Sequence, residues 1–173
     1  MNKSRYLRKK KIDMPGKIKP RLLHLASPVI MVIFFIACNP AVVFEKNQSF
    51  DNNGWHYLDV VSFSHNFSDT TVIYDIFLNV RNNRDYPYSN FIVFLETEFP
   101  DGRIFRDTIE TMLADRQGNW TGDGFGNIKT NSFHFRRNVW FPLEGDYLFR
   151  IEHAMREEYL KGITDIGIRV ERK

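Results

Sequence analysis

Four histidines lie beyond residue 37 and are the first side chains to consider for chemistry: His56, His65, His134 and His153. A metal site brings several ligands together, and short spacings such as HExxH or CxxC are its usual signature. Neither spacing occurs in the chain, and the GxSxG turn that presents a nucleophilic serine is also missing. The sequence therefore predicts isolated histidines, no metal site, no cofactor and no catalytic residues.

Glu96 and Glu98 form the best-placed carboxylate pair, because alternate residues of a strand share one face. A glycoside hydrolase needs two carboxylates that face one bond across a cleft. We expect these two to face solvent instead, with Arg106 as the partner of Glu96. A hydrolase stays open as an alternative only if two of Glu96, Glu98 and Asp107 lie buried in one cleft.

The glycine-rich segment Gly118–Gly126, with the sequence GNWTGDGFG, is the most unusual stretch of the chain. No helix pattern follows it that could hold a phosphate at its N-terminus. It does not match a calcium loop either, because Trp120 stands at the sixth position counted from Asp115, where such a loop needs glycine. Two interpretations remain: a turn and bulge region with Trp120 packed on the fold, or a contact loop that presents Trp120, Asp123 and Phe125.

The three tryptophans, Trp55, Trp120 and Trp140, could stack on sugar rings or could pack in the fold. Val139 and Phe141 continue an inward-facing phase, so Trp140 falls on the opposite phase. The pattern therefore predicts an exposed aromatic side chain at Trp140, suited to a glycan or to a protein partner.

Cys38 is the only cysteine, and it directly follows the apolar run 29–37 and a cationic leader. A charged leader, a short apolar stretch and a small residue before the cut are the layout of a secretory signal. The run is too short to span a bilayer, which takes about 20 apolar residues. The segment Phe35-Ile36-Ala37-Cys38 resembles a bacterial lipobox, which implies that Cys38 is acylated and becomes the first mature residue. A buried apolar cysteine in an uncleaved membrane helix is the alternative.

These features predict a signal peptide over residues 1–37, with Met14 as an alternative start, a lipidated tether over residues 38–53 and a folded domain over residues 54–173. The overall formal charge of +3 comes from the leader. Nine of the 24 cations and one of the 21 anions lie before Cys38, so the remainder carries a formal charge of −5. An acidic domain argues against nucleic acid as a partner, because such binding needs a concentrated basic face.

The elements that must position these side chains are β-strands. Apolar residues alternate with polar ones over 72–80, 133–141, 147–151 and 166–170, and the stretches 55–64 and 91–99 are rich in aromatic and β-branched residues. The turn Phe99–Arg103 predicts a hairpin in which Glu96 lies opposite Arg106. One short helix is expected over 154–161, ended by Gly162. The fold class is an all-β, antiparallel β-sandwich, either immunoglobulin-like or jelly-roll.

The order of several short segments resembles the GldH lipoprotein family of Bacteroidota. The matching segments are Tyr86–Asn90, Phe99–Gly102, Asp107–Glu110, Leu113–Asp115, Gly118–Gly126, Phe141–Pro142, Gly145–Tyr147, Ala154–Arg156 and Gly162–Gly167. The resemblance implies a membrane-anchored lipoprotein of the gliding motility machinery linked to type IX secretion, with envelope proteins as partners. It implies no catalytic residue and no cofactor.

No acidic cluster follows Cys38, and Asn39 rather than aspartate stands at the second mature position. Both features resemble lipoproteins that face the periplasm, on the outer rather than the inner membrane. The sequence thus supports an interaction protein of the envelope, and a glycan-binding β-sandwich module is the second hypothesis. A role in secretion or in the envelope without gliding is the remaining alternative.

Overall fold

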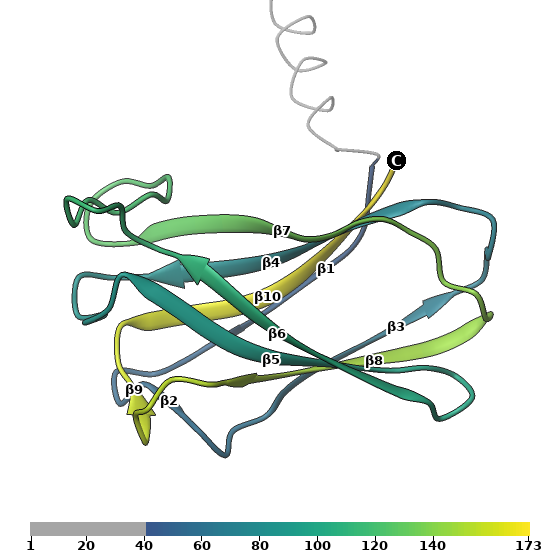
Figure 1. Ribbon diagram of the computed structural model, residues 1–173, viewed down its shortest axis with the longest axis horizontal. Helices are drawn as coiled ribbons and strands as arrows, with labels where there is room; N and C mark the ends of the chain where they lie inside the picture. Colours follow the sequence, from purple (N-terminus) through teal and green to yellow (C-terminus); the bar gives the residue numbers. More distant parts are fainter. Residues whose placement is uncertain (1–40) are drawn as a thin grey trace, which may run out of the picture. The chain divides into compact units, whose positions relative to one another are not determined.

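The computed structural model describes residues 41–173, which form ten β-strands (Figure 1). Eight of them are long enough to build the two main sheets, and the other two form a small ribbon of two residues each. The strands are β1 (Val42–Ser49), β2 (Trp55–His56), β3 (Val61–Phe67), β4 (Tyr74–Asn82), β5 (Asn90–Glu98), β6 (Ile104–Met112), β7 (Lys129–Val139), β8 (Gly145–His153), β9 (Tyr159–Leu160) and β10 (Ile163–Arg172).

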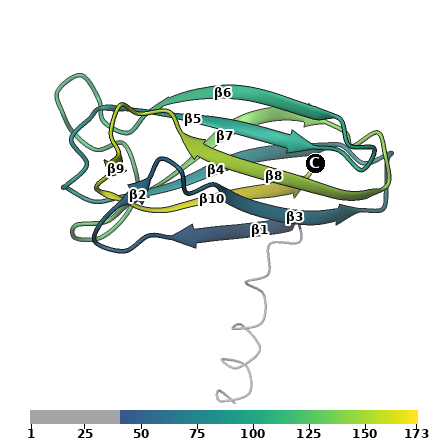
Figure 2. The same ribbon diagram turned by 90° about the horizontal axis from the view of Figure 1, so that it is seen from below.

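The two main sheets each contain four antiparallel strands. One has the order β1-β10-β4-β7 and the other has the order β3-β8-β5-β6. Figures 1 and 2 show the two sheets lying face to face. Only β5 and β6 are successive long strands in one sheet, and every other connection between long strands crosses to the opposite sheet. Of the two sandwich types expected, this order matches the jelly-roll.

The core lies between the sheets and is filled by the inward residues of both. Phe44 of β1 and Phe149 of β8 have ring centroids 6.4 Å apart, which joins the sheets directly. Each strand contributes alternate side chains because successive residues point to opposite faces. The fully buried members include Leu78, Val80, Phe91, Val93, Leu95, Tyr147, Phe149, Ile151, Ile166, Ile168 and Val170.

The predicted hairpin is confirmed in its turn and in its register. The Phe99 amide donates to the Arg103 carbonyl at 2.8 Å, and Gly102 has a φ of 81°. Glu96 pairs with Arg106 across the two strands, as the charge pattern predicted. Turn chemistry and side-chain alternation together therefore determined this pairing.

The tether expected over residues 38–53 is wrong for its larger part, because Val42–Ser49 is strand β1. This strand pairs with β10 from Val42 opposite Glu171 to Ser49 opposite Asp165. Its side chains beyond Phe44 are exposed, so the segment reads as polar although its backbone is bound in the sheet. The folded domain accordingly includes β1 and does not begin at residue 54.

The short helix expected over 154–161 is also wrong, since no helix occurs among residues 41–173. The Ala154 amide donates to the Ile92 carbonyl at 2.8 Å, and β9 pairs with β2. Leu160 is fully buried while Tyr159 is half exposed, which is the alternation of a strand. Pairing with a distant segment thus overrides the local preference of these residues for a helix. In the same range, nothing qualifies as a helix that could cross a membrane.

Candidate interaction surfaces

The Gly118–Gly126 segment lies in the connection from β6 to β7 and is held at both ends by short bridges. Ala114 pairs with Trp120, and Asp123 pairs with Thr130. The Asp115 carboxylate accepts hydrogen bonds from the Gln117 amide at 2.9 Å and from the Asn119 amide at 2.8 Å. The Asn119 side-chain amide also donates to this carboxylate, at 3.0 Å. This bond and the two backbone bonds hold the pKa of Asp115 below its ordinary value. The segment is therefore an ordered loop.

The three loop residues expected to make contacts lie in different environments. Trp120 is partly buried against the core, with its ring 6.5 Å from that of Tyr86. Asp123 is exposed, and its backbone exchanges two hydrogen bonds with Thr130. Phe125 is fully exposed at the loop tip. The loop thus combines the two interpretations, since Trp120 packs on the fold while Asp123 and Phe125 face solvent.

Trp140 follows the last residue of β7, and 63% of its surface is exposed. It borders a groove between the free edges of β6 and β7, which we call the β6–β7 groove. Its neighbours there include Phe105, Phe135 and Val139. This end of the groove has a volume of about 310 Å3. An exposed tryptophan beside an apolar hollow is a surface that a partner can fill.

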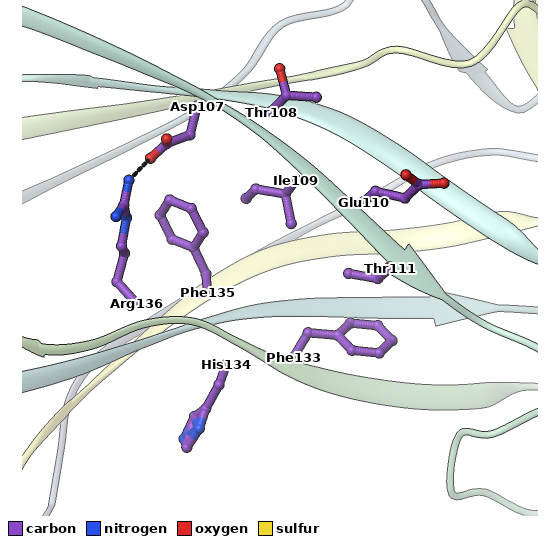
Figure 3. A pocket seen from close by; sticks show the side chains of 9 residues that line it. All are labelled: Asp107, Thr108, Ile109, Glu110, Thr111, Phe133, His134, Phe135 and Arg136. Atoms are coloured by element: carbon purple, nitrogen blue, oxygen red, sulfur yellow. Dashed lines mark hydrogen bonds and ion pairs between the residues drawn. The ribbon is translucent and has the colours of Figure 1, made fainter.

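The middle of the β6–β7 groove is more polar (Figure 3). Asp107 and Arg136 form an ion pair of 2.6 Å across it, and so join the two sheets at this edge. Thr111 points between the sheets and is buried, and its hydroxyl has no hydrogen-bond partner within the described chain. This part has a volume of about 470 Å3, within the range of ligand pockets.

Trp55 is not available to a ligand, because it is fully buried. Its Nε1 donates to the Asp59 carbonyl at 2.7 Å, and its ring stacks 4.8 Å from Phe50. Of the three tryptophans, Trp140 is therefore the one whose ring is mostly open to solvent.

Glu96 and Glu98 lie on the outer face of their sheet, and both bind Arg150, at 2.9 and 2.6 Å. Arg106 is 3.7 Å from Glu96, as expected, but lies closer to Glu152, at 3.0 Å. With Asp107 paired to Arg136, each of the three candidate carboxylates engages an arginine. The structure does not bring them together across one cleft.

The four histidines are separate, and residues 41–173 contain no cluster of three or more potential metal ligands. His153 is buried, and its Nε2 lies 3.1 Å from the Trp55 carbonyl. A carbonyl only accepts, so Nε2 carries the proton of the neutral ring. Burial lowers the pKa of His153 and also that of His65. Both rings thus belong to the packed fold.

An exposed apolar cluster beside the β2–β9 ribbon was not predicted from the sequence. It consists of Tyr57, Leu58, Val60 and Tyr159, which are all about half exposed or more. His56 lies between the two tyrosines, with ring centroids 4.8 and 4.7 Å away. The cluster forms when β9 pairs with β2, more than 100 residues away in sequence, and no local sequence pattern indicates that pairing.

Cys38, the predicted lipid site, and the predicted signal peptide lie outside the described residues.

Comparison with known proteins now gives the family. The model of the family described as "GldH lipoprotein" matches residues 42–170. A gliding motility lipoprotein GldH homolog of Christiangramia forsetii is 36% identical over 151 residues, which cover 83% of this chain and 92% of the relative. The gliding motility lipoprotein GldH of Flavobacterium johnsoniae is 34% identical over 152 residues, covering 84% and 94%.

Among solved structures, the VP2 subviral particle of infectious bursal disease virus aligns with a TM-score of 0.33 and 12% identity, over 75% of this chain and 30% of that one. The family match extends from the start of β1 into β10, and each relative covers more than four fifths of this chain. The chain belongs to the GldH lipoprotein family.

Proposed function

We propose that this protein is a membrane-anchored gliding motility lipoprotein that acts by protein–protein contact in the cell envelope, within machinery linked to type IX secretion. Its family supports the lipoprotein and motility roles. The anchor is the lipid on Cys38, and the body faces the periplasm, on the outer membrane. The domain has a scaffolding role and performs no catalysis.

One observation carries the contact role: Trp140 and Phe105, 63% and 51% exposed, flank the apolar end of the β6–β7 groove. Exposing two large aromatic side chains to water is unfavourable, and burying such residues contributes much of the affinity at protein interfaces. Arg136, whose guanidinium carbon lies 5.5 Å from the Phe105 ring, adds a third residue type that is common at such sites.

A photoreactive amino acid at position 140 in living cells tests this role. We expect a covalent adduct with another envelope protein, found by mass spectrometry, and reduced colony spreading when Trp140→Ala replaces the native chain. Trp140→Phe is the matched control and should retain most spreading, because it keeps an apolar ring. Normal spreading of Trp140→Ala at equal protein level, with no adduct at position 140, would reject the contact surface.

The link to type IX secretion and the membrane side require separate measurements. The Trp140→Ala strain should release less of the proteins that this system secretes, in parallel with its loss of spreading. Protease added to intact cells should leave the protein uncut, while protease added after permeabilising the outer membrane should cut it. Unchanged secretion would contradict the link to type IX secretion. Cutting in intact cells would show that the folded domain lies on the outer surface of the cell.

A glycan is the second candidate ligand for the same groove, and a specific observation favours it. The groove combines an exposed aromatic ring with the Asp107–Arg136 ion pair and with the buried hydroxyl of Thr111, which has no hydrogen-bond partner among residues 41–173. Aromatic stacking with a few directed polar groups is how sugars are bound. Trp140→Ala should then abolish polysaccharide binding with no change in melting temperature, and a broad glycan panel without binding would remove this candidate.

A further inference from the structure

Strand β6 has a free edge. It pairs with β5 along one side, from Asn90 opposite Met112 to Glu98 opposite Ile104, and forms the end of its sheet (Figure 2). Because Phe99 and Arg103 form a hydrogen-bonded pair, the alternation places the backbone groups of Ile104, Arg106, Thr108 and Glu110 on the side away from β5. Among the described residues, no backbone group pairs with them there.

This edge lacks three of the features by which edge strands usually avoid pairing, namely a bulge, a proline and a lysine. The β5–β6 register contains no bulge, and β6 contains neither proline nor lysine. Ile104 and Met112, near its two ends, are 58% and 51% exposed. The neighbouring edge of the other sheet differs, because the β4–β7 register shifts twice and Asn138 has a φ of 53°.

The outer face of the β6 sheet carries a row of alternating charges that stops at this edge. Arg150 lies opposite Glu96, and Glu96 lies opposite Arg106, the last residue of the row. Four positions along β6, Glu110 accepts a hydrogen bond from the Asn90 amide group but has no cation within ion-pair distance among the described residues. The edge therefore ends with one arginine and one carboxylate on the same face.

We propose that two copies of this chain pair through β6 in antiparallel orientation, with Thr108 of one copy opposite Thr108 of the other. In that register Arg106 lies opposite Glu110 of the second copy, and Ile104 lies opposite Met112 of the second copy. Each contact occurs twice because the two-fold axis passes beside Thr108. The charge row continues from Arg106 to a carboxylate, and the exposed apolar residues cover each other.

The two copies would form one continuous sheet of eight strands, with the free backbone groups of β6 paired. A shift of the register by two residues would leave Arg106 opposite Thr108 or Met112, so the charges favour one alignment. This proposal does not depend on the proposed function, because it rests on the backbone edge and the outward charges of β6. The contact role rests instead on Trp140, which follows β7, and on Phe105, whose side chain lines the groove.

Thr108→Cys in the full-length protein, in its native membrane, tests the alignment. Facing residues of a hydrogen-bonded antiparallel pair have Cα atoms about 5.5 Å apart, within reach of a disulfide. We expect a disulfide-linked dimer on mild oxidation. Ser64→Cys is the matched control, because Ser64 is exposed on β3, at the opposite edge of the same sheet. The unmodified chain, with Cys38 alone, is the second control.

Charge reversal in the Thr108→Cys chain then identifies the contact. Arg106→Glu places two carboxylates opposite each other, and Glu110→Arg places two cations opposite each other, so each variant should lose about tenfold of the dimer. When the two variants are expressed together with different tags, opposite charges meet again and the mixed dimer should form. Glu110→Arg is the more informative single change, because Glu110 makes no ion pair with any of the described residues of its own chain.

Two results would overturn the proposal. One is crosslinking of Thr108→Cys no stronger than that of Ser64→Cys. The other is a dimer that survives both single reversals, which would mean that another surface or another protein brings the copies together. Recovery of the mixed dimer also shows that both variants are folded, so loss of pairing in the single variants cannot come from unfolding.

Discussion

His153 shows how the environment of one residue sets a pH response. In the folded chain its ring is buried and neutral, with a lowered pKa, while in the unfolded chain it takes up a proton near pH 6.5. Below that pH the unfolded state binds more protons than the folded state, so stability decreases as the pH falls from about 6.5 towards the lowered pKa. His65, also with a lowered pKa, adds an effect of the same sign.

We therefore expect the melting temperature to decrease between pH 7 and pH 5, and His153→Gln to reduce this decrease. Glutamine keeps an N–H donor for the Trp55 carbonyl but does not titrate. The lowered pKa values of Asp69, Asp101 and Asp115 act in a more acidic range, below about pH 4, and leave this window to the histidines. A decrease of equal size in His153→Gln and the native chain would contradict the assignment.

Single residues were predictable where they belong to a long alternation. Trp140 stands between Val139 and Phe141, so its outward direction follows from its phase, and it is mostly exposed. Trp55 lies in a strand of two residues, which is too short to show a phase, and nothing local indicates its burial. Arg150 was missed as the partner of Glu96 and Glu98 because it comes from β8, more than 50 residues away.

Two turn glycines with the same backbone conformation should differ in their importance for stability. Gly162, between β9 and β10, has a φ of 81°, and a Cβ atom there would clash with the backbone of Asp85 and Tyr86. Gly102, in the β5–β6 turn, has the same φ but open space around the Cβ position. We expect Gly162→Ala to lower the free energy of unfolding by at least about 3 kcal/mol, since both backbone strain and a clash arise.

Gly102→Ala is the matched control, and its cost should be about 1 to 2 kcal/mol from backbone strain alone. Chemical denaturation of the two variants and the native protein gives both values. Equal losses in the two variants would show that the close approach of Gly162 to the Tyr86 segment does not matter for stability.

Strands were predictable from the sequence where a clear turn and a clear alternation of apolar and polar residues occurred together. The β5–β6 hairpin has a turn with its own chemistry and strands with clear alternation, so its register followed. Strand β1 buries Phe44 and exposes the five residues after it, so its stability comes from backbone pairing with β10. Backbone pairing does not require particular side chains, so the sequence did not predict this strand. The segment 154–161 contains good helix formers, yet its place beside β2 and Ile92 decides its conformation.

The position of the folded domain in the whole molecule depends on the short stretch of chain between Cys38 and β1. Only residues 39–41 separate Cys38 from β1, and a chain of that length spans at most about 14 Å. Replacing the expected longer tether by a strand therefore keeps the domain near any lipid on Cys38. Cys38→Ser should move the protein from the membrane fraction to the soluble fraction, because each buried methylene of an acyl chain contributes about 0.8 kcal/mol.

Ala41→Ser is the control for this experiment, as it changes a nearby residue and leaves the thiol in place. Fractionation followed by immunoblotting, together with labelling by radioactive palmitate, gives the result. Membrane retention of Cys38→Ser, or no label on the native chain, would rule out the lipid on Cys38.

The pairing of β1 with β10 has a mechanical consequence for a protein attached through its N-terminal end. Tension that enters at Ala41 passes first into β1, whose neighbour in the sheet is the last strand of the chain. If the opposing pull acts at the far end of the sandwich, the hydrogen bonds of this ladder are loaded side by side and must break together. The β1–β10 hydrogen bonds then carry the load in shear between the membrane anchor and the rest of the domain.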